Sequence, residues 1–386
     1  MEWEFATAAR IVFGAGALRH AAPAARETGA RALVVTGRSP ARAQALASGL
    51  DAAGLAYAFF RITGEPTIDA VREGVERFRA GGCDFVIAVG GGSAIDAGKA
   101  IAALAVNPGS AADYLEVIGA GRPLEVAPAP FIAIPTTAGT GSEVTRNAVL
   151  ASPEHRVKVS LRSPRMLARL AVVDPELTLD LPRAITASTG LDTLTQLIEP
   201  YVSTRANPMA DGFCVEGIRR VARSLEPAFQ NGHDHEARAD MSLASLLSGL
   251  ALANAALGIV HGIAAPVGGM YPAPHGAVCA AVLPHAMEAN IRALRARAPE
   301  SDAIGRYQAV ARLLTGDPDA DAEDGTVWVR DLCKKLQIPP LAVYGLAEGE
   351  VAEVAAKAAR ASSTKGNPVP LTAAEIHGII ECAQRG

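Results

Sequence analysis

Residues 89–100 have the composition of a phosphate-binding turn. An apolar run leads into four small residues that open a helical pattern, Gly90, Gly91, Gly92 and Ser93. Glycine lets backbone N–H groups approach a phosphate closely, and a helix N-terminus adds partial positive charge. The turn is not a G-x-G-x-x-G fingerprint, because Ile95 replaces the last glycine, and Ala100 breaks the P-loop pattern. Alone, it fits an ordinary tight turn equally well.

A second turn, residues 135–143, also follows an apolar run. Its hydroxyl groups can donate to a pyrophosphate or a ribose, and they belong to Thr136, Thr137, Thr140 and Ser142. Two such turns, each directly after a buried strand, favour a dinucleotide-binding crevice over ordinary turn chemistry. We expect the first turn and Asp96 to contact the same cofactor.

The elements that position these turns are strands alternating with helices within residues 1–180. The patterns predict strands at 31–36, 56–62, 84–89 and 131–134, and helices at 39–53 and 67–80. Repeated βα units of this kind build a doubly wound parallel sheet, which binds ligands at the carboxyl ends of its strands.

From Pro182 onward the pattern is helical almost throughout. The expected helices are 185–203, 208–225, 235–260 and 276–297. The chain therefore divides near residue 180 into an α/β dinucleotide-binding domain, 1–180, and an all-helical domain, 181–386.

Together the two turns resemble the paired signature of the iron-containing (group III) alcohol dehydrogenases. The first fits Gly-Gly-Gly-Ser-x-x-Asp-x-x-Lys over residues 90–99, and the nonapeptide 135–143 is highly specific. The match extends through segments 174–178, 189–192, 274–276 and 365–368, so it covers nearly the whole chain. The resemblance implies the fold shared with dehydroquinate synthase, a parallel-sheet dinucleotide domain followed by a helical metal and substrate domain. It also implies NAD(P)-dependent interconversion of a small alcohol with an aldehyde or ketone.

The resemblance further implies a metal site of one aspartate and three histidines. Asp192, His261 and His275 match three of these positions, but Gln196 replaces a histidine. Asp192 and Gln196 are one helical turn apart and share a face, whereas His261 is expected late in a long apolar helix and His275 at the start of the next. Carboxylate and imidazole ligands suit Fe(II) or Zn(II), and a glutamine oxygen is a weaker fourth ligand.

Two departures from the family pattern keep other interpretations open. Gln196 could mark a degenerate site, as in maleylacetate reductase, which is understood to work without a metal; chelation would then leave activity intact. Ala265 stands where many relatives have a histidine that relays protons, so no protein acid or base is assigned here. A dehydroquinate-synthase-like lyase and a non-catalytic nucleotide sensor are further alternatives.

Cofactor preference is predicted from the end of the first long strand. Relatives that prefer NAD commonly have an aspartate there, which accepts hydrogen bonds from the adenosine ribose. Here the position is Gly37, and Arg38 follows, so a 2′-phosphate meets no repulsion and can pair with a guanidinium. We therefore expect NADP(H) to be favoured over NAD(H). By resemblance, Lys158 points toward the nicotinamide end.

Composition excludes several other classes of function. Net charge is −4, with no dense Lys/Arg block, which argues against nucleic acid as a partner. The five cysteines are scattered and form no Cys-x-x-Cys pair, which fits a reducing cytoplasm. No apolar run reaches membrane-spanning length and the N-terminus lacks signal-peptide character, so a cytoplasmic location is expected. By resemblance, the chain forms a homodimer or larger homo-oligomer.

Overall fold

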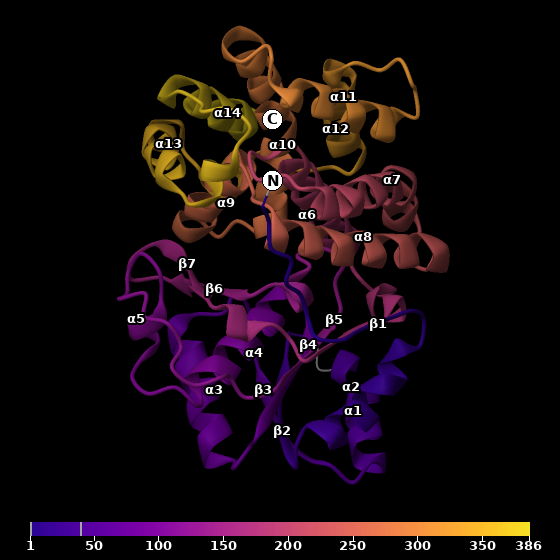
Figure 1. The fold of residues 1–386 in the computed structure, drawn as a ribbon, viewed down its shortest axis with the longest axis vertical. Coiled ribbons are helices and arrows are strands. Elements are labelled where there is room, and N and C mark those ends of the chain that lie inside the picture. The colour runs from indigo at the N-terminus through magenta and orange to yellow at the C-terminus, as the bar shows by residue number, and fades with distance from the viewer. Residues whose placement is uncertain (1, 39–40) are drawn as a thin grey trace. The chain divides into compact units, whose positions relative to one another are not determined.

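The computed structural model describes residues 2–38 and 41–386, which form two compact units (Figure 1). The α/β unit comprises residues 6–137 and 141–179, and the helical unit comprises residues 180–386. Two short segments from the first half of the chain, the N-terminal residues up to Phe5 and Ala138–Thr140, group with the helical unit. The division of the chain therefore lies next to residue 180, but it is not a single cut.

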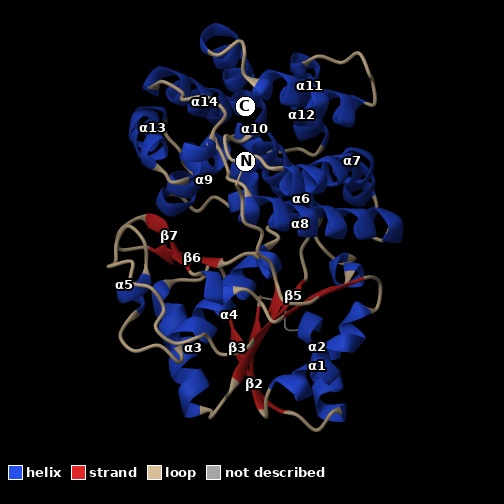
Figure 2. Cartoon of the chain, in the orientation of Figure 1, coloured by secondary structure: helices blue, strands red, loops and turns tan. Residues whose placement is uncertain are grey.

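The α/β unit is built on a parallel six-stranded sheet, as the sequence predicted (Figure 2). Its strand order is β1-β8-β5-β4-β2-β3, where the strands are β1 (Ile11–Phe13), β2 (Arg31–Thr36), β3 (Ala56–Arg61), β4 (Phe85–Gly90), β5 (Phe131–Pro135) and β8 (Leu170–Val173). The central strands β4 and β5 are buried at every residue, because helices cover both faces of a parallel sheet. Their uninterrupted apolar runs are the sequence signature of that burial.

Helices pack on the two faces of this sheet, and Figure 2 draws α1 and α2 on the side opposite α3 and α4. The helices of the unit are α1 (Ala21–Thr28), α2 (Ala41–Ala52), α3 (Ile68–Ala80), α4 (Gly92–Leu104) and the single turn α5 (Ala111–Tyr114). Side chains of α1 and α2 share a core with Val34, Ile87 and Ile132. On the other face, α4 lies close to Ala88 and Phe131 at its Gly98.

Four strands lie outside the runs predicted above. Two of them, β6 (Asn147–Ser152) and β7 (Val157–Arg162), form a separate antiparallel pair. The others are β1 and β8, which have only three and four residues. These two strands pair with each other, and β8 also pairs with β5.

The helical unit contains no strand among its described residues, which confirms the predicted all-helical character. Its helices are α6 (Arg183–Val202), α7 (Pro208–Gln230), α8 (His235–Asn254), α9 (Ile259–Met270), α10 (His275–Arg297), α11 (Asp302–Thr315), α12 (Ala322–Lys335), α13 (Val351–Arg360) and α14 (Ala373–Arg385). One apolar core joins nearly all of them, and α6 and α10 contribute buried residues along most of their length.

One predicted helix is wrong in this unit. Residues 235–260 were expected to form one long helix, but α8 ends at Asn254 and α9 begins at Ile259, with a bend of 99° between them. His261 therefore stands near the start of α9 and not late in a long helix. Across the described residues, no single helix is long and apolar enough to cross a membrane, and α8 with α9 meets that length and composition only as a bent pair.

Candidate metal centre and cofactor-binding edge

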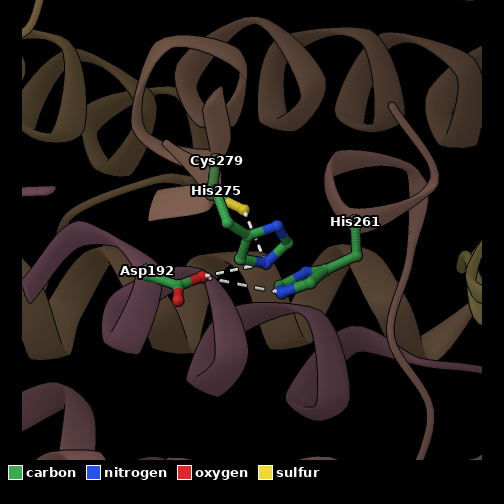
Figure 3. Close-up of side chains that lie close together, drawn as sticks. All are labelled: Asp192, His261, His275 and Cys279. Carbon is green, nitrogen blue, oxygen red and sulfur yellow. Dashed lines mark hydrogen bonds and ion pairs between the residues drawn. The ribbon is translucent and has the colours of Figure 1, made fainter. Parts of the chain in front are cut away.

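Three of the predicted metal ligands come together inside the helical unit (Figure 3). Asp192 is on α6, His261 on α9 and His275 on α10. The Nε2 atoms of both histidines lie 3.7 Å from Oδ1 of Asp192. A fourth side chain joins them, because Cys279 Sγ lies 3.7 Å from His275 Nε2. The candidate ligand atoms of these four residues all lie within 4.8 Å of one another.

The Asp192 carboxylate has the environment of a metal ligand. The side chain is buried, and its Oδ1 has no hydrogen-bond partner. A buried charge without a partner is costly unless it coordinates a metal or is paired. Burial raises the pKa of Asp192 to about 6, against the opposing effects of His261 and of hydrogen bonds from Cys279 and Gln196. The residues present therefore fit a divalent cation that would occupy the point they share.

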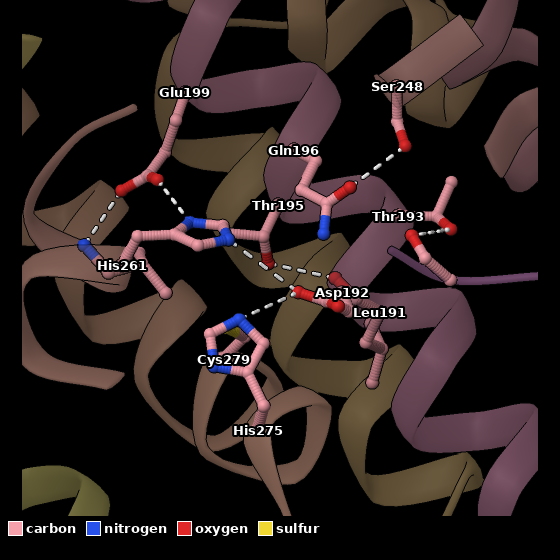
Figure 4. Close-up of polar contacts among 12 residues, drawn as sticks. Leu191, Asp192, Thr193, Thr195, Gln196, Glu199, Ser248, His261, His275 and Cys279 are labelled. Atoms are coloured by element: carbon pink, nitrogen blue, oxygen red, sulfur yellow. Dashed lines mark hydrogen bonds and ion pairs between the residues drawn. The ribbon is translucent and has the colours of Figure 1, made fainter. Parts of the chain in front are cut away.

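Glu199 fixes the orientation of His261 (Figure 4). It lies two turns after Asp192 on α6, and its Oε2 accepts a hydrogen bond of 2.6 Å from His261 Nδ1. Because Nδ1 carries this proton, the lone pair of the neutral ring is on Nε2, which faces Asp192. Burial alone would lower the pKa of His261, but the Glu199 carboxylate, together with Asp192, outweighs this effect and raises that pKa.

The start of α9 is held by side chains from distant parts of the helical unit. The amide of Val260 donates to Glu199 Oε1 at 2.7 Å, and the amide of Ile259 donates to Asn367 Oδ1 at 3.1 Å. The first amides of a helix have no partner within it, so these two contacts act as a cap. They place His261 in the first turn of α9.

His275 is the first residue of α10, as predicted, and a close backbone approach follows it. A Cβ added at Gly276 would lie 2.5 Å from the carbonyl oxygen of Ser188 on α6. Only glycine lets the N-terminus of α10 approach α6 so closely. The approach brings His275 to Asp192.

Gln196 shares the Asp192 face of α6, as its spacing predicted, but its carbonyl oxygen has another partner. The Ser248 hydroxyl, on α8, donates to Gln196 Oε1 at 3.0 Å (Figure 4). The role of Gln196 as a metal ligand stays a prediction. Ala265, one turn after His261 on α9, carries no group that could move a proton.

The predicted cofactor residues of the first turn lie at the carboxyl edge of the sheet. Gly90 ends β4 beside Pro135, which ends β5. A Cβ at Gly90 would lie 3.2 Å from the amide nitrogen of Gly37, which follows β2, and one at Gly91 would touch Thr137. Three strand ends thus meet here. Helix α4 begins at Gly92, and its N-cap, Gly91, has no side chain to satisfy the first amides, so a phosphate can accept from them.

Asp96 and Ser142 bind each other at this edge. The Ser142 hydroxyl donates to Asp96 Oδ1, and the amide of Val149 donates to Oδ2 at 2.9 Å. The buried Lys99 donates to the Ser142 carbonyl and to the Thr145 hydroxyl, each at 2.9 Å. This network ties α4 to the segment after β5. Contact of Asp96 and Ser142 with a cofactor stays a prediction.

The remaining predicted cofactor residues have different surroundings. Arg38 is exposed and donates from Nε and Nη2 to the Thr63 carbonyl at 3.2 Å. Lys158, on β7, has a largely covered side chain that pairs with Glu65 at 3.2 Å. Thr136 is buried at the end of β5, and Thr140 belongs to the helical unit.

Two residues of the candidate metal centre were not predicted from the sequence. Cys279 lies four residues after His275, and Glu199 lies seven residues after Asp192, so each shares a helix face with a predicted ligand. The same helical spacing that singled out Gln196 could have found both.

Comparison with known proteins identifies the family. The sequence profile described as "Iron-containing alcohol dehydrogenase" matches residues 8–175, and "Fe-containing alcohol dehydrogenase family, C-terminal" matches residues 186–384. The chain belongs to the iron-containing alcohol dehydrogenase family.

Similar members of this family align over most of the chain. Alcohol dehydrogenase 4 of Schizosaccharomyces pombe is 37% identical over 319 residues, covering 82% of this chain and 73% of that protein. The NAD-dependent methanol dehydrogenase of Bacillus methanolicus is 34% identical over 379 residues, covering 96% and 97%. A crystal structure of a 1,3-propanediol oxidoreductase superposes with a TM-score of 0.91 at 33% identity, covering 99% of this chain and all of that one. The family resemblance inferred from the two turns is confirmed.

Proposed function

We propose that this chain is an alcohol dehydrogenase that interconverts a small alcohol and its aldehyde or ketone with a nicotinamide cofactor, assisted by a divalent metal ion. The observation that carries the metal role is the buried Asp192 Oδ1, which has no hydrogen-bond partner and lies 3.7 Å from two imidazole nitrogens. Asp192, His261 and His275 would hold the ion. Iron or zinc suits these ligands.

The chain's own residues would position the reactants. A divalent ion bound at this centre supplies a Lewis acid that polarises a carbonyl or lowers the pKa of an alcohol, and the nicotinamide supplies or accepts the hydride. Glu199 holds the Nδ1 side of His261, so that Nε2 is directed at Asp192 and carries the lone pair of the neutral ring. Gly37, after β2, leaves open space for the dinucleotide, and the N-terminus of α4 favours its phosphates.

The test is metal analysis paired with turnover. Purified protein should contain stoichiometric iron or zinc and oxidise NADPH with an aldehyde, lose activity on chelation, and regain it when metal is restored. Activity that survives complete removal of metal would favour a metal-independent carbonyl reductase, the alternative that Gln196 and Ala265 support.

We also propose that NADP(H) is favoured over NAD(H). A Cβ at Gly37 would meet no atom within 4 Å, so the end of β2 is open, and the exposed Arg38 guanidinium beside it can pair with a 2′-phosphate. One relative is named NAD-dependent, so the two cofactors must be compared directly. We expect Arg38→Ala to lower kcat/KM for NADPH but not for NADH, with the exposed Arg72→Ala as the control. A wild-type preference for NADH would refute the assignment.

A further inference from the structure

Cys279 faces the same point as the three candidate ligands of the metal centre. It lies one turn after His275 on α10, is fully buried, and its Sγ is 3.7 Å from His275 Nε2. Its thiol also hydrogen-bonds the Asp192 carboxylate. A buried cysteine by itself is often only a small apolar side chain. Here, however, it adjoins a buried carboxylate oxygen that has no hydrogen-bond partner.

The spacing of these atoms fits a tetrahedral ion. Bonds of about 2.0–2.3 Å to oxygen, nitrogen and sulfur require spacings of about 3.3 Å between oxygen and nitrogen and about 3.6 Å between nitrogen and sulfur. The three measured spacings, from Asp192 to each histidine and from His275 to Cys279, are each 3.7 Å. The remaining pairs lie within 4.8 Å. The three 3.7 Å spacings need to contract by a few tenths of an ångström and the remaining pairs by up to about 1.5 Å to complete the site.

Gln196 is the competing fourth ligand. Its carbonyl oxygen faces the Ser248 hydroxyl, and its amide group hydrogen-bonds Asp192. An amide NH2 group donates hydrogen bonds and does not bind a cation. Gln196 would have to rotate its amide and give up the contact with Asp192 before its oxygen could reach the ion, whereas the sulfur of Cys279 already faces the other ligand atoms.

We propose that the Cys279 thiolate is the fourth protein ligand of the metal centre, in place of the side chain at position 196. The inference rests on the proposed function, because it presumes a divalent ion held by Asp192, His261 and His275. As the metal–sulfur bond forms, the thiol proton passes to solvent, so no oxidant or reductant is needed. A thiolate with two imidazoles favours zinc over Fe(II), which binds such ligands more weakly. The site would then hold zinc in a family named for iron.

X-ray absorption of the zinc-loaded protein tests this ligand set directly. Wild-type protein carrying one zinc should show one sulfur atom at about 2.3 Å, with nitrogen and oxygen at about 2.0–2.2 Å. Cys279→Ser and Cys279→Ala should lose the sulfur signal. The matched control is Cys333→Ser, a cysteine outside the cluster whose thiol donates to the Ala280 carbonyl, and it should keep the signal. Gln196→Ala should keep it too.

Zinc affinity gives a second measurement. Loss of an outer partner of a metal ligand already costs about 10–100-fold in affinity, so Cys279→Ala should cost at least about tenfold. One bound zinc without sulfur in the wild-type spectrum would overturn the inference and return the fourth position to Gln196, while the proposed function would stand. A wild-type protein that takes up no zinc or iron would overturn the metal-assisted function as well.

Discussion

Glu199→Gln is the most direct test of how the ligands of the proposed metal centre are positioned. The change keeps the size of the side chain but removes the charge that accepts the 2.6 Å hydrogen bond from His261 Nδ1. The amide oxygen can still accept from the Val260 amide, 2.7 Å away in the wild type, so the start of α9 should persist. The variant therefore separates electrostatic support of the ligand from folding of the helix.

The expected magnitude follows from the hydrogen bond that is lost, because the amide NH2 group that replaces Oε2 cannot accept from His261 Nδ1. Outer partners of metal-bound histidines typically contribute about 10–100-fold in affinity. We expect Glu199→Gln to weaken zinc binding by about tenfold, or about 1.4 kcal/mol. The control variant Glu226→Gln should bind zinc with the wild-type affinity, because it alters a carboxylate that pairs with Lys335 elsewhere in the helical unit.

The assay is titration of metal-free protein with zinc in the presence of a competing chromophoric chelator. Circular dichroism of the same samples checks that helix content is unchanged. Affinity within twofold of wild type in a folded Glu199→Gln variant would refute the role assigned to this carboxylate. The His261 orientation would then depend on packing alone.

Three further changes test other parts of the structure. Lys99→Met should lower the free energy of unfolding in urea by about 3–5 kcal/mol, because it removes the buried partner of the ion pair with the partly buried Asp96; a loss under about 1 kcal/mol would contradict this. The Arg297 guanidinium lowers the pKa of Glu375 from 4.5 to about 2, so this pair stabilises the fold above pH 4.5 and the contribution is lost as pH falls toward 2. As pH falls from 4.5 toward 2, the melting temperature of Glu375→Gln should therefore fall less steeply than that of the wild type. Parallel curves would show that the Arg297–Glu375 pair does not cause the loss of stability in acid. Gly276→Ala should destabilise the fold by about 1–3 kcal/mol and weaken zinc binding, since its Cβ would push α10 from α6; unchanged zinc affinity would show that the close approach is not needed.

Much of the α/β unit could be predicted because its signals are local. Buried parallel strands give uninterrupted apolar runs, and β2 was expected at its observed bounds. The strand β8 was not predicted because its four apolar residues are too few to show a period. Its place next to β5 depends on pairing between distant segments.

The candidate metal centre was predicted in part for a similar reason. Asp192 and His275 lie in helices whose starts are visible in the sequence. The break before His261 is not visible, because residues 255–258 are Ala-Ala-Leu-Gly, a largely apolar run that reads as a continuation of α8. The new helix start depends on capping by Glu199 and Asn367, which lie 61 and 108 residues away from the amides they accept from. Such contacts exist only in the folded chain.

The path of the chain through Ala138–Thr140 restricts how its two halves can be recombined. Ala138 belongs to the apolar core of the helical unit, and the carbonyl of Gly139 accepts a hydrogen bond of 3.1 Å from the buried Thr193 hydroxyl on α6. Three residues from the middle of the first half are therefore built into the second. A chimera joined at residue 180 would set α6 of one parent against the loop of another, and a mismatch would leave the Thr193 hydroxyl buried without its acceptor. Halves can be exchanged only between parents whose residues match in this loop and in α6. The two halves of the chain therefore cannot be recombined independently of each other.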